Sequence, residues 1–119
     1  MYDDLEDIKE VYEELFRKLF NRVDFTFVHD HVGFLKVADK KYDLFVCDWM
    51  LGAVGDKLLQ ANYVLPLVNA KRKLIITGYD SEHPEIGEYS KRESIPVIIK
   101  GGGYDEMLDK FKSSLDGPN

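Results

Sequence analysis

Three short runs, apolar except for Lys73 at the start of the second, each end at a polar side chain, and they set the strongest limit on what this chain can fold into. The predicted strands cover residues 44–47, 73–76 and 96–99, and they end at Asp48, Thr77 and Lys100. A run without polar interruption fits a strand that is buried on both faces, as in a parallel sheet between helices.

Helical segments alternate with these strands. Helices are predicted over 4–20, 31–40, 56–70 and 104–115, and the polar stretch 80–93 predicts a short or irregular helix. Strands that alternate with helices imply right-handed crossovers. The expected fold is therefore α/β, with a parallel sheet and helices on both faces.

The predicted elements carry further detail. A short strand is expected over 25–28, and Asp3 or Asp4 can cap the first helix. The helix over 31–40 is expected to bury Val32, Leu35 and Ala38. Pro66 should end or kink the helix over 56–70.

Length and composition limit the class of protein. The 119 residues suit one domain, 1–119, with a linker-like tail over 115–119. The net charge of −6 argues against nucleic-acid binding, which needs clustered basic residues. Cys47 is the single cysteine, so no internal disulfide is possible. We expect a cytoplasmic protein, because no apolar run could span a membrane and no signal peptide is visible.

Polar residues with complementary chemistry should meet at one edge of the sheet. Asp48, Thr77 and Lys100 end strands, while Asp3 and Asp4 stand at the entry to the first helix. The carboxyl ends of parallel strands share an edge, where ligands bind. Clustered carboxylates favour a divalent cation such as Mg²⁺. One carboxylate could attack phosphorus while a lysine and a hydroxyl stabilise charge on the transferred group.

Four segments resemble the signature blocks of response-regulator receiver domains, the phosphoprotein modules of two-component signal transduction. The blocks are Tyr2–Ile8, Tyr42–Leu51, Ile75–Gly78 and Pro96–Lys100. The separations from Asp4 to Asp48, from Asp48 to Thr77 and from Thr77 to Lys100 are 44, 29 and 23 residues. These spacings are typical of the family, and the resemblance covers nearly the whole chain.

The resemblance implies a flavodoxin-like, doubly wound sheet and a role for each residue. Asp48 would be the phospho-acceptor, and Thr77 and Lys100 would contact the phosphoryl group. The carboxylates of Asp3, Asp4 and Asp48 and the carbonyl of Met50 would hold Mg²⁺ or Mn²⁺. A histidine kinase or phosphotransfer protein would be the donor. Such a domain catalyses only its own phosphorylation and dephosphorylation, so we expect no enzyme acting on an external substrate.

Three positions depart from the family pattern. Gly101 replaces the proline that usually follows the lysine, so the peptide bond there should be trans and the loop looser. Val97 stands where many members carry an aromatic residue, and Gly52 replaces a common proline. These changes leave the chemistry possible and alter the usual output surface.

The first strand of the family is missing or truncated, because only Met1 and Tyr2 precede Asp3. Three arrangements could compensate: segment 24–28 moves next to 44–48, a second chain supplies a strand, or two copies exchange elements. We therefore expect a homodimer or strand exchange, and weaker metal binding than in a chain extended by a few apolar residues.

Two other functions remain open from the sequence. The chain could be a degenerate receiver that acts as a protein-binding scaffold without phosphorylation, or a small metal-dependent phosphatase. Haloacid-dehalogenase-type phosphatases place a second aspartate where Met50 stands. Cys47 reads as a core residue, His29 and His31 as ordinary loop residues, and Trp49 as a surface or ligand-contacting residue.

Overall fold

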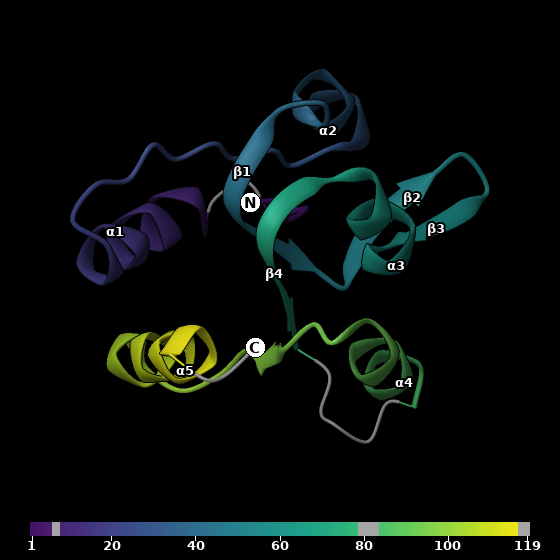
Figure 1. The fold of residues 1–119 in the computed structure, drawn as a ribbon. Coiled ribbons are helices and arrows are strands. Elements are labelled where there is room, and N and C mark those ends of the chain that lie inside the picture. The colour runs from purple at the N-terminus through teal and green to yellow at the C-terminus, as the bar shows by residue number, and fades with distance from the viewer. Residues whose placement is uncertain (6–7, 79–83, 117–119) are drawn as a thin grey trace.

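The chain alternates between strands and helices, as its sequence predicts (Figure 1). The computed structural model describes residues 1–5, 8–78 and 84–116. The strands are β1 (Lys41–Asp48), β2 (Met50–Val54), β3 (Lys57–Gln60), β4 (Asn69–Thr77) and β5 (Val97–Ile99). The helices are α1 (Lys9–Leu19), α2 (His31–Val37), α3 (Ala61–Val64), the 3₁₀ turn η2 (Leu65–Leu67), α4 (Pro84–Glu93) and α5 (Tyr104–Asp116).

Three parallel strands form the main sheet, in the order β1-β4-β5. Cys47 lies opposite Ile75, and Ile76 lies opposite Ile98. In Figure 1, α1 and α5 lie on one side of this sheet and α2, α3 and α4 on the other. The apolar runs predicted as strands therefore form the middle layer of an α/β fold.

The alternation of side chains along the strands divides the core into two halves. Phe45 and Cys47 belong to the half that packs under α2, α3 and α4. Val46 and Leu74 belong to the half that packs under α1 and α5, where Phe111 is fully buried. Because both faces are covered along the second halves of β1 and β4, residues 44–47 and 74–76 can be apolar without interruption, whereas the first halves carry charged, exposed residues.

The first strand is reduced to one paired residue. Tyr2 forms parallel bridges with Val28 on one side and Cys47 on the other. Its N–H donates to the Val46 carbonyl, and its carbonyl accepts from Asp48 N–H, both at 2.9 Å. Tyr2 thus extends the sheet by a short central segment. The predicted move of segment 24–28 next to β1 is wrong, since Tyr2 lies between them.

The N-terminal helix begins later than expected. The helix predicted over 4–20 is α1, which starts at Lys9, and residues 6 and 7 lie outside the described residues. The proposed capping role of Asp3 or Asp4 is wrong, because Ile8 occupies the N-cap position without a side-chain cap. The Asp3 carboxylate instead accepts a hydrogen bond from Leu5 N–H at 3.0 Å.

Helix α2 turns a different face inward than the one predicted. Val32 and Leu35 are 66% and 58% exposed, so their expected burial is wrong, whereas Phe34 is fully buried. Asp30 caps the helix by accepting from Gly33 N–H at 2.7 Å, which sets where the helix starts. The ring of Phe34 then stacks on that of Tyr2, with centroids 5.3 Å apart.

A β-hairpin replaces most of the helix predicted over 56–70. Strands β2 and β3 pair antiparallel through a two-residue connection, Gly55-Asp56. Gly55 has a φ of +63°, which glycine adopts without a steric penalty. Only the short α3 and η2 remain helical, and Pro66 lies in the 3₁₀ turn. The chain therefore leaves Asp48 through a hairpin.

The C-terminal half follows its prediction more closely. The strands expected over 73–76 and 96–99 are β4 and β5, and the helix over 104–115 is α5. The short or irregular helix predicted over 80–93 is wrong, because Pro84–Glu93 form a regular ten-residue helix, α4, while residues 79–83 lie outside the described part. The predicted tail 115–119 begins too early, since Leu115 and Asp116 belong to α5, and residues 117–119 lie outside the described part.

Tyr2 should be a large single contributor to stability. Replacing it with alanine (Tyr2→Ala) removes a fully buried ring, and comparable aromatic truncations cost about 3–5 kcal/mol. Its hydroxyl has no hydrogen-bond partner among the described residues, so Tyr2→Phe should change the free energy of unfolding little. Urea unfolding of both variants tests this. A similar loss in Tyr2→Phe would contradict the packing argument.

Candidate functional site

Three elements bring their polar residues to one edge of the sheet. Asp48 is the last residue of β1, Thr77 is the last residue of β4, and Lys100 follows β5. The backbone fixes their relative heights, because Lys100 N–H donates to the Thr77 carbonyl at 2.7 Å. Asp48 and Thr77 precede Lys100 by 52 and 23 positions in the chain, and the fold makes the three residues neighbours, as predicted from their places at strand ends.

Lys100 lies between two aspartates. Its Nζ is 3.0 Å from Asp48 Oδ2 and 3.2 Å from Asp3 Oδ2. Asp3 is fully buried and Asp48 is 7% exposed, so both carboxylates are largely removed from water. A buried carboxylate without a partner lowers the stability of the fold, and here one ammonium group pairs with two carboxylates.

Asp4 adds a third carboxylate at the exposed rim. One carboxylate oxygen from each of Asp3, Asp4 and Asp48 lies within 4.8 Å of the others. The backbone positions this group through the Tyr2 segment, since Asp48 N–H donates to the Tyr2 carbonyl directly before Asp3. The three acidic residues predicted to converge are therefore together.

The electrostatics of the cluster favour added positive charge. Burial and the nearby Asp3 carboxylate raise the pKa of Asp48 to about 7, although Lys100 partly opposes the shift. Burial and Asp3 also raise the pKa of Asp4. Burial alone would lower the pKa of Lys100, but Asp48 and Asp3 outweigh it and the net shift is upward. Three carboxylates against one ammonium make a site whose negative charge is incompletely balanced.

These donors fit a hard divalent cation. Mg²⁺ and Mn²⁺ take oxygen ligands, and Mg²⁺ usually joins one or two protein carboxylates while keeping several waters. The exposed Asp4 and the end of β1 leave the cluster reachable from solvent. The residues present therefore suit such an ion in number, element and charge.

Thr77 and Met50 are the other two residues that the sequence assigned to this site. Thr77 is 1% exposed at the end of β4, one strand away from Asp48. Met50 begins β2 two residues after Asp48, and its sulfur accepts from the Gln60 side-chain amide at 3.8 Å. Met50 thus lies near the site in sequence, while the ligand role of its carbonyl stays a prediction.

Tyr12 lies near the site without having been predicted there, and Gly52 was noted only as a departure from the family pattern. Tyr12 on α1 is 8% exposed, and its pKa is raised to about 12 by burial, with Lys100, Asp3 and Asp48 close enough to influence it. A side chain at Gly52 would have its Cβ 4.0 Å from Asp4 Oδ2. Tyr12 lies within the helix predicted over 4–20, and the helical period alone does not show that its side chain lies near Lys100 and the aspartates.

The glycine loop after Lys100 has a steric role. Gly102 has a φ of +76°, and a Cβ there would clash with the Glu106 side chain. No cis peptide bond occurs among the described residues, so the expected trans bond at Gly101 is confirmed. Of the three glycines, only Gly102 lies close to the first turn of α5, since a Cβ at Gly101 or Gly103 would meet no other atom within 4 Å.

The remaining residues considered from the sequence are one cysteine, one tryptophan and two histidines. Cys47 is fully buried, and burial raises its pKa, which agrees with a core role. Trp49 is 2% exposed, so it is not a surface residue, and its ring lies 5.8 Å from that of Tyr89. His29 is an exposed loop residue as predicted, whereas His31 is the first residue of α2 and its ring stacks on that of Phe34.

A scan of protein-family models, a search of curated proteins and a search of solved structures each found no match. No helix in the described part of the chain is long and apolar enough to cross a membrane.

The raised pKa of Asp48 predicts a pH-dependent effect of Asp48→Asn on stability. The folded pKa of about 7 lies above the ordinary value of 3.8, so the folded state binds this proton more tightly than the unfolded state does. The ionised carboxylate therefore destabilises the fold increasingly as pH rises from about 4 to 7. In metal-free buffer at pH 7.5, Asp48→Asn should stabilise the fold by roughly 1–3 kcal/mol, with a smaller gain at pH 5.

Thermal unfolding of the parent and variant between pH 5 and pH 8 measures this difference. Asp43→Asn is the matched control, because Asp43 is an exposed aspartate on the same strand. A stability gain for Asp48→Asn that does not change with pH would contradict the electrostatic explanation.

Proposed function

We propose that this chain is a phosphoryl-accepting signalling domain of the receiver type, phosphorylated on Asp48. The observation that carries the proposal is the convergence of Asp3, Asp4, Asp48 and Lys100 at one sheet edge, with Asp48 at a strand end. These are the residues that the receiver-like sequence blocks assign to phosphoryl transfer.

The strand arrangement is compatible with a flavodoxin-like fold. Across the sheet the segments run Val28, Tyr2, β1, β4 and β5, when the two single-residue bridges are included. A doubly wound sheet of the order 2-1-3-4-5 has the same sequence of neighbours. Ligands of such folds bind beyond the carboxyl ends of the strands, where the aspartate cluster lies.

Asp48 suits the nucleophile better than its neighbours do. In the proposed step a carboxylate oxygen of Asp48 forms a bond to phosphorus, while the bond from phosphorus to the donor nitrogen or oxygen breaks and the leaving group takes a proton. Asp3 is fully buried and accepts from Leu5 N–H, which holds its carboxylate in place. Asp48 carries no such backbone contact in the described residues and is held mainly by Lys100.

Lys100 and Thr77 supply stabilisation around the transferred group. The Lys100 ammonium already contacts the Asp48 carboxylate, so it can follow negative charge as it moves onto phosphoryl oxygens. Thr77 at the neighbouring strand end would donate its hydroxyl to the same oxygens. Mg²⁺ or Mn²⁺ held by Asp3, Asp4 and Asp48, with the Met50 carbonyl, would neutralise the carboxylates that otherwise repel the phosphate.

In this proposal the partner is a histidine kinase or phosphotransfer protein, and the chain catalyses only its own phosphorylation and dephosphorylation. The net charge of −6 suits a protein partner better than nucleic acid. A cytoplasmic location belongs to the same proposal, since such donors act there.

The direct test is intact mass after incubation with a small acyl-phosphate or phosphoramidate donor and Mg²⁺. We expect a gain of one phosphoryl group in the parent and in Asp43→Asn, and none in Asp48→Asn. Labelling that survives in Asp48→Asn would place the acceptor elsewhere. Failure of both the parent and the control to label would favour the scaffold function instead.

Metal binding can be followed through Trp49, which is buried directly after Asp48. Titration with Mg²⁺ should change its fluorescence, with a midpoint on the order of millimolar for an ion that keeps several waters. Asp4→Ala should weaken the affinity about tenfold or more, whereas Asp56→Ala at the exposed hairpin tip should not. Identical titrations for Asp4→Ala and the parent would remove Asp4 from the ligand set.

A further inference from the structure

A cavity of about 260 Å³ lies between α3 and α4, on the side of the sheet away from α1 and α5 (Figure 1). Trp49 lines it between β1 and β2, Asn62 and Tyr63 line it from α3, and Glu88 and Tyr89 line it from α4. None of the clustered aspartates belongs to this lining, so the cavity is separate from the site described above. We name it the indole pocket after the ring of Trp49.

Two buried polar atoms of the indole pocket lining have no hydrogen-bond partner. They are Nε1 of Trp49 and Oδ1 of Asn62, and neither has a partner among the described residues. Trp49 is 2% exposed, so bulk water does not replace the missing partner of its N–H. Buried polar groups are nearly always paired, because an unpaired one opposes folding. Two such atoms in one lining point to a group that binds there.

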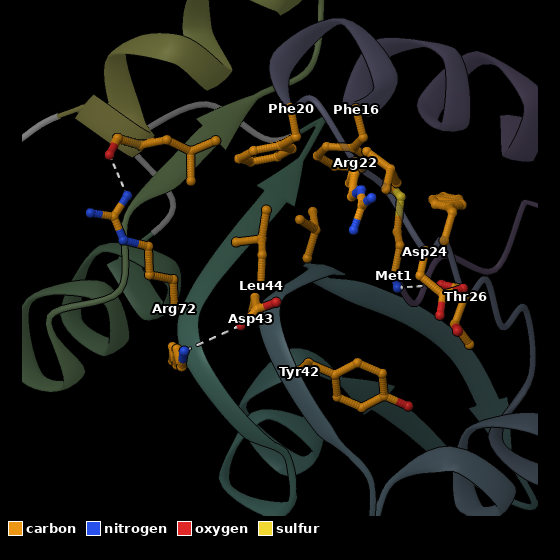
Figure 2. A pocket seen from close by; sticks show the side chains of 15 residues that line it. Met1, Phe16, Phe20, Arg22, Asp24, Thr26, Tyr42, Asp43, Leu44 and Arg72 are labelled. Carbon is orange, nitrogen blue, oxygen red and sulfur yellow. Dashed lines mark hydrogen bonds and ion pairs between the residues drawn. The ribbon is translucent and has the colours of Figure 1, made fainter.

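The cavity of about 480 Å³ beside Met1 differs in this respect (Figure 2). Polar groups of its lining contact each other, since Lys71 pairs with Asp43 and Arg72 donates to the Leu115 carbonyl. No buried side-chain polar atom of that lining lacks a partner. The larger cavity therefore has no unmet hydrogen bond that would select a ligand, whereas the indole pocket has two.

The two unpartnered atoms need opposite hydrogen-bonding groups. The Trp49 N–H can only donate, so it needs an acceptor such as a carbonyl oxygen. The Asn62 carbonyl oxygen can only accept, so it needs an N–H or O–H donor. An amide carries both groups side by side, whereas a carboxylate has no donor and an ammonium has no acceptor.

The charges around the indole pocket disfavour an anion. Glu85 and Glu88 line it, and neither forms an ion pair among the described residues. Arg92 also lines it, but its guanidinium pairs with Glu93 at 3.4 Å and lies 5.3 Å from the centre of the Tyr89 ring. The lining therefore keeps an excess of negative charge, which favours a neutral or cationic ligand.

Aromatic rings and a small volume limit the shape of the ligand. Tyr63 presents an exposed ring, and the buried ring of Tyr89 lies 5.8 Å from that of Trp49. Flat groups stack well on such rings. Pockets for drug-sized ligands usually hold about 300–1,000 Å³, so this one suits a single ring with short substituents.

We propose that the indole pocket binds the amide group of a small, flat ring compound that carries no negative charge. The amide carbonyl accepts from Trp49 Nε1, and the amide N–H donates to Asn62 Oδ1. Ring carboxamides, such as nicotinamide, and lactam nucleobases, such as 1-methyluracil, both have this chemistry. The inference does not depend on phosphorylation of Asp48.

The test follows the indole N–H of Trp49 by NMR during separate titrations with nicotinamide and with 1-methyluracil. The chain has a single tryptophan, so one indole cross-peak reports on the pocket without further assignment. We expect at least one compound to move this peak downfield, with saturation at one molecule per chain. A response to nicotinamide alone assigns the pocket to ring carboxamides, and a response to 1-methyluracil alone assigns it to lactams.

Methylated ligands test the donor to Asn62. N,N-dimethylnicotinamide and 1,3-dimethyluracil keep their carbonyl groups but lack the N–H, and each should bind at least tenfold more weakly than its parent compound. Asn62→Ala should weaken binding of the parent compound about tenfold, whereas Asn69→Ala, at an exposed asparagine in β4, should not. A peak that moves with neither compound, or equal affinity for the methylated ligands, would overturn the proposal.

Anionic ligands test the charge of the pocket. Nicotinate and 1-methylorotate should bind at least tenfold more weakly than nicotinamide and 1-methyluracil. A variant with Glu85→Gln and Glu88→Gln should reduce that difference, while Glu14→Gln on α1 should not. These substitutions change exposed side chains, so the test holds even if Asn62→Ala fails to fold. Equal binding of the anions by the parent chain would contradict the charge argument and the proposal with it.

Discussion

The pairing of Tyr2 with strands on both sides is the contact on which the rest of the molecule depends. One residue joins Val28 to β1 and so connects the outer segment of the sheet to its parallel centre. Its side chain also fills the core under α2 through Phe34. Because Asp3 and Asp4 follow directly, the geometry of the aspartate cluster is a consequence of where Tyr2 is held.

The charges of the aspartate cluster are not balanced within the fold. Two buried carboxylates share the Lys100 ammonium, and a third lies at the rim. Structural ion pairs usually satisfy their charges, since an uncompensated buried charge opposes folding. A site that retains excess negative charge and stays open to solvent fits the binding of a cation better than it fits a role in stability.

Sequence patterns predicted the middle layer and the last helix well, because burial on both faces leaves an unmistakable apolar run in β1 and β4. They predicted the site for the same reason, since Asp48, Thr77 and Lys100 each end such a run. The hairpin β2–β3 was missed, as the backbone conformations of Gly52 and Gly55 leave no periodic signal.

Two other misses have related physical causes. The inward face of α2 was assigned wrongly because seven residues are too few to define an apolar stripe, and the packing of Phe34 against Tyr2 sets its rotation. A strand of one paired residue has no period at all, so the position of Tyr2 could not be found from pattern alone.

The hairpin has a mechanical consequence of its own. It leaves the sheet one residue after Asp48, and the hydrogen bond from Ala61 N–H to the Trp49 carbonyl holds its base. The five residues of β2 extend about 15 Å from the sheet. A rotation of about ten degrees at Met50 would therefore move the hairpin tip by roughly 3 Å. Small movements beside the aspartates would thus produce larger displacements at the tip.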